Sequence, residues 1–407
     1  MASSLHFLLL VSSFLYTFSI SQAKPYNQLN GLIFHVKKDV STLQYVTEIH
    51  HGTPLVPTKL VVDLGGPFLW LNCSSSSSSR LIYQRSIQCL AAKPKTHVQG
   101  SNKKCDIFTE NRITQVATQG DLLEDIMAVD QVTDGSKTGS KSITAVGYNI
   151  LFSCAPIFLL NGIPSGAKGM LGLGRTQMSM ASQISAQLSS KFQFIICLSS
   201  SNGVVLHENG HHSSNFRSKI PDSMTYTPLV NQVESPHEYI INLKSIKICG
   251  KKMSPDIVEG KIKLSTIVPY STVESSIYAT FTKVYEQAAM SMNMTRVSPV
   301  APFGQCFSSR KNDGTLVGPK VPVIDLVLQS EMVEWRIHGR NSMVQVSDEV
   351  MCLGFLDGGL NLKTSMVIGG YQLEDTLLHF DVGASRLGFT HQSCFELRLD
   401  SEFKHTL

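Results

Sequence analysis

Two similar segments, about 200 residues apart, most constrain the fold of this 407-residue chain. Each is a short apolar strand that runs into a turn, and each follows a strand that opens on a tyrosine, Tyr45 or Tyr239. The repeat predicts an internal duplication in which Asp63 and Ser265 occupy equivalent positions. The two segments are Lys59-Leu-Val-Val-Asp-Leu-Gly-Gly-Pro-Phe-Leu-Trp70 and Ile262-Lys-Leu-Ser-Thr-Ile-Val-Pro-Tyr270.

Short β-rich runs separated by Gly, Pro, Ser and Asn make up most of the chain, which is long enough for two compact domains. Tyr45–Ile49 with the turn after it predicts a hairpin, and so does Glu238–Leu243 followed by Ile246–Gly250. One longer helix is expected, because Ser271-Thr-Val-Glu274 has the pattern of a capping box and apolar residues follow at helical spacing. That helix is expected to pack beside the strand that ends at Ser265.

Several further motifs carry a resemblance to a known family. A strand that ends in Asp-Thr/Ser-Gly, once per lobe, is the signature of pepsin-like aspartic proteases, and Asp63-Leu-Gly-Gly66 is a degraded copy. Over roughly residues 30–394 the chain resembles the plant xylanase- and xyloglucanase-inhibitor group, which includes basic 7S globulins, extracellular dermal glycoproteins and nectarins. The matching stretches are Val61–Trp70, Phe152–Pro156, Gly169–Arg175, Leu264–Tyr270, Val300–Phe307, Ile324–Ser330 and Val367–Asp375.

The resemblance implies an all-β fold with few short helices, a bilobal pepsin-like double β-barrel with a central cleft. The expected organisation is a signal peptide at 1–23, an N-terminal lobe at 24–227, a linker at 228–236 and a C-terminal lobe at 237–407. Residues 1–23 carry no Lys, Arg, Asp or Glu, hold a short apolar run and end in small residues, as a secretory signal does.

An aspartic protease holds one water between two carboxylates that share a proton. Ser265 can donate or accept a hydrogen bond, but it cannot exchange protons as a carboxyl group does near neutral or acidic pH. No tyrosine lies between Cys105 and Leu122, where the substrate-covering flap should supply one. We therefore expect Asp63 and Ser265 to be vestigial, with no functional catalytic residue.

Composition and residue spacing also bear on whether the chain binds nucleic acid, a membrane or a metal. The formal net charge of +4 is too small to indicate a nucleic-acid partner, and no segment after the leader is long and apolar enough to cross a membrane. His50-His51 and His211-His212 lack metal-ligand spacing and are expected to be solvated loop residues. Neither a cofactor nor a metal is expected, and the protein is expected to be secreted to the apoplast or cell wall.

Nine cysteines in a secreted chain predict disulfides with one thiol left over, although spacing does not give their connectivity. The resemblance implies Cys73–Cys154, Cys89–Cys105, Cys197–Cys394 and Cys306–Cys352, which leaves Cys249 unpaired. The sequence also contains two glycosylation sequons, at Asn293 and Asn72, of which Asn293 is the better candidate because Asn72 abuts an expected disulfide.

Some members of the resembled group plug the active site of microbial glycoside hydrolases with loops of the C-terminal lobe. The corresponding loops here follow Cys306 and precede Cys394, and they offer Arg310, Lys311 and His391 as basic groups for paired carboxylates. These residues are equally expected as ordinary surface residues. The sequence thus predicts an inhibitor of xylanase or xyloglucan endoglucanase. The alternatives are a seed-storage or peptide-binding 7S-globulin-like protein and, last, an active protease.

Overall fold

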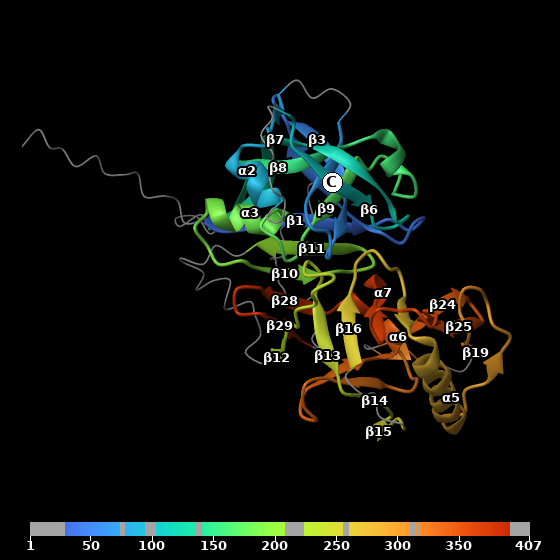
Figure 1. Ribbon diagram of the computed structural model, residues 1–407. Coiled ribbons are helices and arrows are strands. Elements are labelled where there is room, and N and C mark those ends of the chain that lie inside the picture. The colour runs from blue at the N-terminus through green and yellow to red at the C-terminus, as the bar shows by residue number, and fades with distance from the viewer. Residues whose placement is uncertain are drawn as a thin grey trace, which may run out of the picture.

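The computed structural model describes residues 29–73, 78–93, 103–134, 141–207, 224–254, 260–309, 314–315 and 318–390. The chain is mostly strands with a few short helices, and it forms two lobes (Figure 1). The first half, blue to green, makes the upper lobe, and the second half, yellow to red, makes most of the lower lobe. The prediction of a bilobal, all-β, pepsin-like fold is confirmed.

One large sheet runs through the N-terminal lobe and into the region between the lobes, where β10, β11, β28 and β29 lie (Figure 1). Its middle follows the order β1–β2–β3–β9–β4–β8–β7, and β2 and β3 form the predicted hairpin. The strands are β1 (Leu29–Lys38), β2 (Tyr45–His51), β3 (Val56–Asp63), β4 (Trp70–Asn72), β5 (Arg80–Leu81), β6 (Asp106–Asn111), β7 (Val116–Asp134), β8 (Lys141–Ala155), β9 (Gly169–Gly172), β10 (Gln193–Cys197), β11 (Asn202–His207), β12 (Thr225–Pro228), β28 (Leu377–Asp381) and β29 (Arg386–Phe389). The helices of this lobe are α2 (Ile87–Ala92), the 3-10 helix η1 (Ile157–Leu160) and α3 (Met180–Gln187).

The C-terminal lobe is built from smaller sheets and one longer helix, α5 (Ser275–Ser291). Its strands are β13 (Ile240–Leu243), β14 (Ser245–Ile248), β15 (Lys251–Lys252), β16 (Gly260–Leu264), β17 (Ser271–Val273), β18 (Arg296–Val297), β19 (Cys306–Ser308), β20 (Gly314–Thr315), β21 (Gly318–Pro319), β22 (Ile324–Val327), β23 (Glu334–Ile337), β24 (Met343–Ser347), β25 (Val350–Leu353), β26 (Phe355–Asp357) and β27 (Met366–Ile368). Two short helices, α6 (Gly339–Ser342) and α7 (Gly370–Leu373), complete it. No helix in the described part of the chain combines the length and apolarity of a membrane span.

The two lobes repeat one arrangement of four strands. In the first, β3 runs parallel to β9, β9 antiparallel to β4, and β4 parallel to β8. In the second, β16, β27, β17 and β26 pair in the same order and with the same directions. Asp63 is the last residue of β3, and Ser265 directly follows β16. The duplication predicted from the sequence is therefore present in the sheet topology.

The second predicted hairpin is wrong. β13 pairs with β16, whereas β14 pairs with β15 and β22 in a different sheet. Only Lys244 separates β13 from β14, and one residue is too short to reverse the chain, since hairpin loops need two or more.

The predicted capping box is also wrong. Ser271 lies in β17, where its hydroxyl donates to Gln372 Oε1 at 2.8 Å. The helix begins after Glu274, whose carboxylate accepts hydrogen bonds from the backbone N–H groups of Ser276 and Ile277. Phe281 and Tyr285 on its apolar face are fully buried, as the spacing predicts, but α5 packs against β14 and β26 rather than beside β16.

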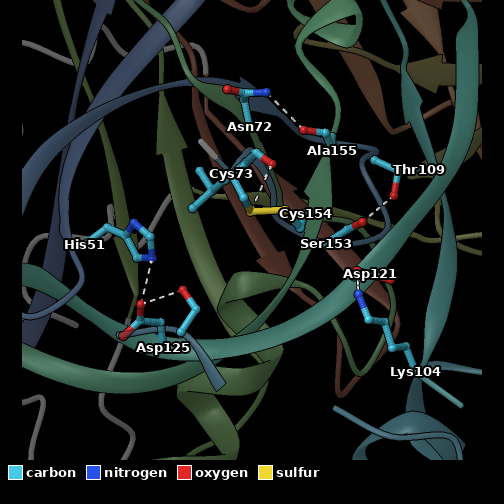
Figure 2. The surroundings of a disulfide bond; sticks show 12 residues. His51, Asn72, Cys73, Lys104, Thr109, Asp121, Asp125, Ser153, Cys154 and Ala155 are labelled. Atoms are coloured by element: carbon cyan, nitrogen blue, oxygen red, sulfur yellow. Dashed lines mark hydrogen bonds and ion pairs between the residues drawn. A yellow bond between two sulfur atoms is a disulfide. The ribbon is translucent and has the colours of Figure 1, made fainter. Parts of the chain in front are cut away.

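The structure contains the disulfides Cys73–Cys154, Cys89–Cys105 and Cys306–Cys352. Cys197 is also disulfide-bonded, and its expected partner Cys394 lies outside the described residues. Cys249 is a free, exposed thiol. Figure 2 shows the first bond, which joins Cys73, directly after β4, to Cys154 in the parallel strand β8.

The prediction for His50 and His51 is also wrong, because both residues lie in β2 and not in a loop. Figure 2 shows His51 beside Asp125. His51 Nε2 is 3.3 Å from Asp125 Oδ2, and the hydroxyls of Ser78 and Ser79 donate to the same oxygen. Burial lowers the pKa of His51 despite this carboxylate. His211 and His212 lie outside the described residues.

Candidate functional site

The site begins with Asp63, which an apolar strand carries into the space between the lobes. Val61 and Val62 on β3 are completely buried, and the Asp63 side chain is itself only 3% exposed. Its Oδ1 accepts a hydrogen bond from the backbone N–H of Gly65 at 3.2 Å. A carboxylate buried to this degree requires a countercharge, because an isolated buried charge is very costly.

Arg112 supplies that countercharge. It stands at the tip of the β6–β7 hairpin, where the Asn111 side chain accepts hydrogen bonds from the N–H groups of Ile113 and Thr114 and so fixes the turn. Arg112 Nη1 donates to Asp63 Oδ1 at 2.7 Å. A Cβ atom on Gly65 would lie 2.6 Å from this Nη1, so glycine at that position makes room for the guanidinium.

The charges continue into the C-terminal lobe. Arg112 Nη2 donates to Glu238 Oε1, and Lys263 Nζ on β16 lies 3.1 Å from the same oxygen. The four side chains form a chain of alternating charge that links the two lobes. Burial opposes the charge on Arg112, but Asp63 and Glu238 outweigh it and raise the pKa of Arg112, which therefore stays protonated. Burial and the nearby Arg112 lower the pKa of His237, so its imidazole is neutral at pH 7.

Ser265 and Thr266 form the matching turn of the second lobe. The Ser265 oxygen accepts hydrogen bonds from its own turn, from the N–H groups of Ile267 and Val268 at 3.2 Å each. Thr266 reaches across instead: its hydroxyl donates to Val62 O at 2.6 Å and accepts from Leu64 N–H at 3.0 Å. Leu64 has no side-chain hydroxyl that could make the equivalent hydrogen bond to the second turn. The hydrogen bonds of this kind between the two turns are therefore made by Thr266 alone.

This arrangement favours binding and structural roles over proton transfer. The Asp63 carboxylate is held by a guanidinium, and a guanidinium does not release its proton in proteins. General acid–base chemistry needs a group that can change its protonation near the working pH. Within the described ranges, no three His, Cys, Asp or Glu side chains gather in a way that could hold a metal ion.

The predicted residues fall into two groups. Asp63 and the turn after Ser265 meet between the lobes, joined by the Thr266 hydroxyl. The inhibitory-loop residues Arg310, Lys311 and His391 lie outside the described residues. Sequence reasoning missed Arg112, Glu238 and Lys263. It noted the absence of a tyrosine between Cys105 and Leu122, and a search of that interval for a charged replacement would have found Arg112.

The fold and its interlobe cluster define a pepsin-like, bilobal protein with an ion pair where its two lobes meet. The xylanase inhibitor N-terminal model matches residues 45–206, and the xylanase inhibitor C-terminal model matches residues 238–391. Because these matches cover more than half of the chain, it belongs to the xylanase-inhibitor family.

Known proteins of two kinds are similar to it. The chain is 42% identical to the probable aspartic proteinase GIP2 of Nicotiana benthamiana, over 100% of this chain and 99% of that protein. It is 36% identical to gamma conglutin 1 of Prunus dulcis, over 97% and 96% of the two chains. Among solved structures, EDGP matches with a TM-score of 0.79 at 41% identity, over 91% of this chain and 96% of that one. Basic 7S globulin from soybean matches with a TM-score of 0.75 at 31% identity, over 90% and 96%.

Proposed function

We propose that this chain is a secreted protein inhibitor of microbial wall-degrading glycoside hydrolases, of the xylanase or xyloglucan-endoglucanase class, and that it does not cut peptides. The observation that carries the proposal is the match of both halves to the xylanase-inhibitor models. Disulfides in both lobes and relatives named as conglutins and a 7S globulin support secretion to the apoplast or cell wall.

The absence of proteolysis rests on the interlobe cluster. Ser265 occupies the position that corresponds to Asp63 in the repeated strand arrangement, so the second carboxylate of an aspartic protease is replaced. Arg112 adds a second obstacle, because its guanidinium bonds the remaining carboxylate at 2.7 Å. Removal of one member of a cooperative catalytic unit costs roughly 10⁴–10⁶ in rate in enzymes of other classes.

This part of the proposal has its own test. Neither the wild-type chain nor Ser265→Asp is expected to cleave casein at acidic pH, because the arginine remains in place in both. Cleavage by the wild-type chain that is inhibited by pepstatin would overturn the non-proteolytic assignment.

Inhibition is assigned to the two C-terminal loops. The first follows β19, which the Cys306–Cys352 disulfide ties to β25, and the second follows β29. Arg310, Lys311 and His391 are the proposed contacts. A basic side chain that enters between the two catalytic carboxylates of a hydrolase forms charge-assisted hydrogen bonds with them, and these bonds are strong because water is excluded. Contact through His391 would strengthen below its pKa, near 6.5 for an ordinary histidine.

The test is inhibition of a panel of microbial xylanases and xyloglucanases by the purified mature chain at pH 5 and pH 7. Arg310→Ala, Lys311→Ala and His391→Ala are compared with Lys168→Ala, a matched removal of an exposed charge on the other lobe. Stoichiometric inhibition that at least one loop variant weakens tenfold, and the control leaves unchanged, supports the proposal. Absence of inhibition across the panel by the folded protein overturns it.

A second candidate is a storage or peptide-binding role of the 7S-globulin type. Relatives named gamma conglutin 1 and basic 7S globulin 2, at 36% and 33% identity over nearly the whole chain, favour it. This role requires none of the loop residues, so it predicts wild-type behaviour for all three loop variants.

A further inference from the structure

A cavity of about 400 Å³ lies beside Arg112, between the lobes. Its walls come from the β6–β7 hairpin, from the segment 232–238 before β13, and from residues 361–367 around the start of β27. Asp63 does not line it, because Arg112 stands between that carboxylate and the open space. The volume falls within the range of small-molecule sites, roughly 300–1,000 Å³.

The wall is polar and rich in amides. Gln115, Gln232 and Asn361 contribute side-chain amides, and Ser235 and Thr364 contribute hydroxyls. Amides and hydroxyls both donate and accept hydrogen bonds, which matches the alternating N–H and C=O groups of a peptide backbone. None of the residues that line the cavity is Phe, Tyr or Trp, so it lacks the flat apolar face on which a sugar ring stacks.

The charges inside the cavity are mostly satisfied by one another. Arg112 is bonded to Asp63 and Glu238, and Lys263 shares Glu238 with it. Ligand groups that approach these residues find them already paired. Recognition of a charged ligand therefore depends on the remaining two charged residues of the wall.

Those two residues have opposite sign and come from opposite lobes. Glu110 on β6 is exposed, and its charge acts on Arg112, but it makes no direct ion pair with the described part of the chain. Lys363, on the C-terminal lobe, is 72% exposed, and its Nζ is 3.9 Å from the equally exposed Glu234. An exposed pair at this distance contributes little, so the ammonium group of Lys363 is available to a ligand.

We propose that this cavity binds a short zwitterionic peptide, of about two or three residues, whose ammonium group faces Glu110 and whose carboxylate faces Lys363. The cavity volume of about 400 Å³ limits the ligand to this length. Free peptides carry both end charges, and each forms a charge-assisted hydrogen bond with the residue it faces. This site is separate from the proposed inhibitory loops, and it gives the peptide-binding candidate a location.

The experiment is calorimetric titration of the full mature chain with free trialanine, N-acetyl-trialanine, trialanine amide and xylotriose, a neutral trisaccharide of similar size. Free trialanine is expected to bind, and removal of either end charge is expected to weaken binding about tenfold, the effect of about 1.4 kcal/mol. Equal binding of the capped peptides, preferential binding of xylotriose, or no binding of trialanine would each overturn the proposal.

Two variants assign the ends of the peptide. Glu110→Gln is expected to weaken free trialanine about tenfold and to leave N-acetyl-trialanine unaffected. Lys363→Gln is expected to do the same for free trialanine and to leave trialanine amide unaffected. Lys168→Gln is the matched control, since it removes an exposed charge outside the cavity. Loss of all binding in either variant, capped forms included, would contradict the orientation and overturn the proposal as stated.

The same variants keep this inference apart from hydrolase inhibition. Glu110→Gln and Lys363→Gln are expected to inhibit the hydrolase panel as the wild-type chain does, because neither residue lies in the proposed inhibitory loops. Peptide binding without hydrolase inhibition would support the peptide site and refute the inhibitor proposal. Hydrolase inhibition without peptide binding would support the inhibitor proposal and refute the peptide site.

Discussion

Arg112 Nη1 lies 2.7 Å from Asp63 Oδ1, although the two residues are 49 positions apart in the chain. Both side chains are largely withdrawn from water, at 15% and 3% exposure. The pair fixes the tip of a hairpin against the turn that follows β3. Because Arg112 also bonds Glu238, the same guanidinium holds the N-terminal lobe to the C-terminal lobe.

Arg112→Met should lower the free energy of unfolding by roughly 3–5 kcal/mol, because it leaves the Asp63 carboxylate buried and unpaired. Asp63→Asn combined with Arg112→Met should recover much of this loss, since the double variant buries no charge at this position. Urea unfolding followed by tryptophan fluorescence measures both. Arg80→Met, which removes a 63% exposed partner of Glu124, is the control and should cost less than about 1 kcal/mol. If Arg112→Met lowered the free energy of unfolding no more than Arg80→Met does, Arg112 would not be the countercharge that stabilises the buried Asp63 carboxylate.

Thr266→Val should destabilise the protein by about 1–3 kcal/mol, because it keeps the shape of the side chain but removes the hydroxyl that serves Val62 O and Leu64 N–H. Thr266→Ser retains that hydroxyl and should cost less. Thermal unfolding of the three proteins gives the comparison. Equal losses in the two variants would mean that packing of the methyl group, and not the hydrogen bonds between the turns, accounts for the effect.

His207 should make the protein less stable in acid. Burial lowers the pKa of His207 to about 4, and its Nε2 lies 2.7 Å from Ser185 Oγ. The unfolded chain binds a proton at this residue near pH 6.5 and the folded chain only near pH 4, so stability is fully present above pH 6.5 and is lost as the pH falls through this window. The contribution is about 3 kcal/mol.

His207→Gln should flatten the dependence of unfolding free energy on pH between pH 4 and pH 6.5, as measured by urea unfolding at several pH values. Ser185→Ala is the control: it removes the hydrogen-bond partner but keeps the titrating group, so the slope should remain. An unchanged slope in His207→Gln would show that other groups produce the acid sensitivity.

A glycan is expected at Asn293 and not at Asn72. Asn293 is exposed, lies two residues after the end of α5 and has a φ of 60°. Asn72, by contrast, is half-buried in β4 and donates its amide to Ala155 O at 3.1 Å (Figure 2). Its neighbour Cys73 is bonded to Cys154, which restricts access further. Intact-mass measurement of protein secreted from plant cells should show one glycan that Asn293→Gln removes. A mass change in Asn72→Gln would contradict this assignment.

Local sequence pattern predicted the structure correctly where a single strand and its turn determine it. It failed where a residue distant in the chain determines the local structure. The spacing after Val273 correctly gave the buried face of α5, but the capping box at Ser271 did not form. Gln372, 101 residues away, accepts the Ser271 hydroxyl instead and holds that residue in a strand. A capping box offers only two hydrogen bonds to the backbone, and a buried side-chain partner supplied by the tertiary fold can outcompete it.

The sequence by itself determined the duplicated fold, because two apolar strands that run into turns, and the glycine-rich segments they pair with, recur in both halves. It also determined that the second turn carries Ser265 where the first carries Asp63. Only the tertiary structure decided what surrounds that carboxylate. Arg112, Glu238 and Lys263 are far apart in the chain, and no periodicity relates them. A buried charge nevertheless requires a partner wherever the fold can bring one, and here the β6–β7 hairpin brings Arg112.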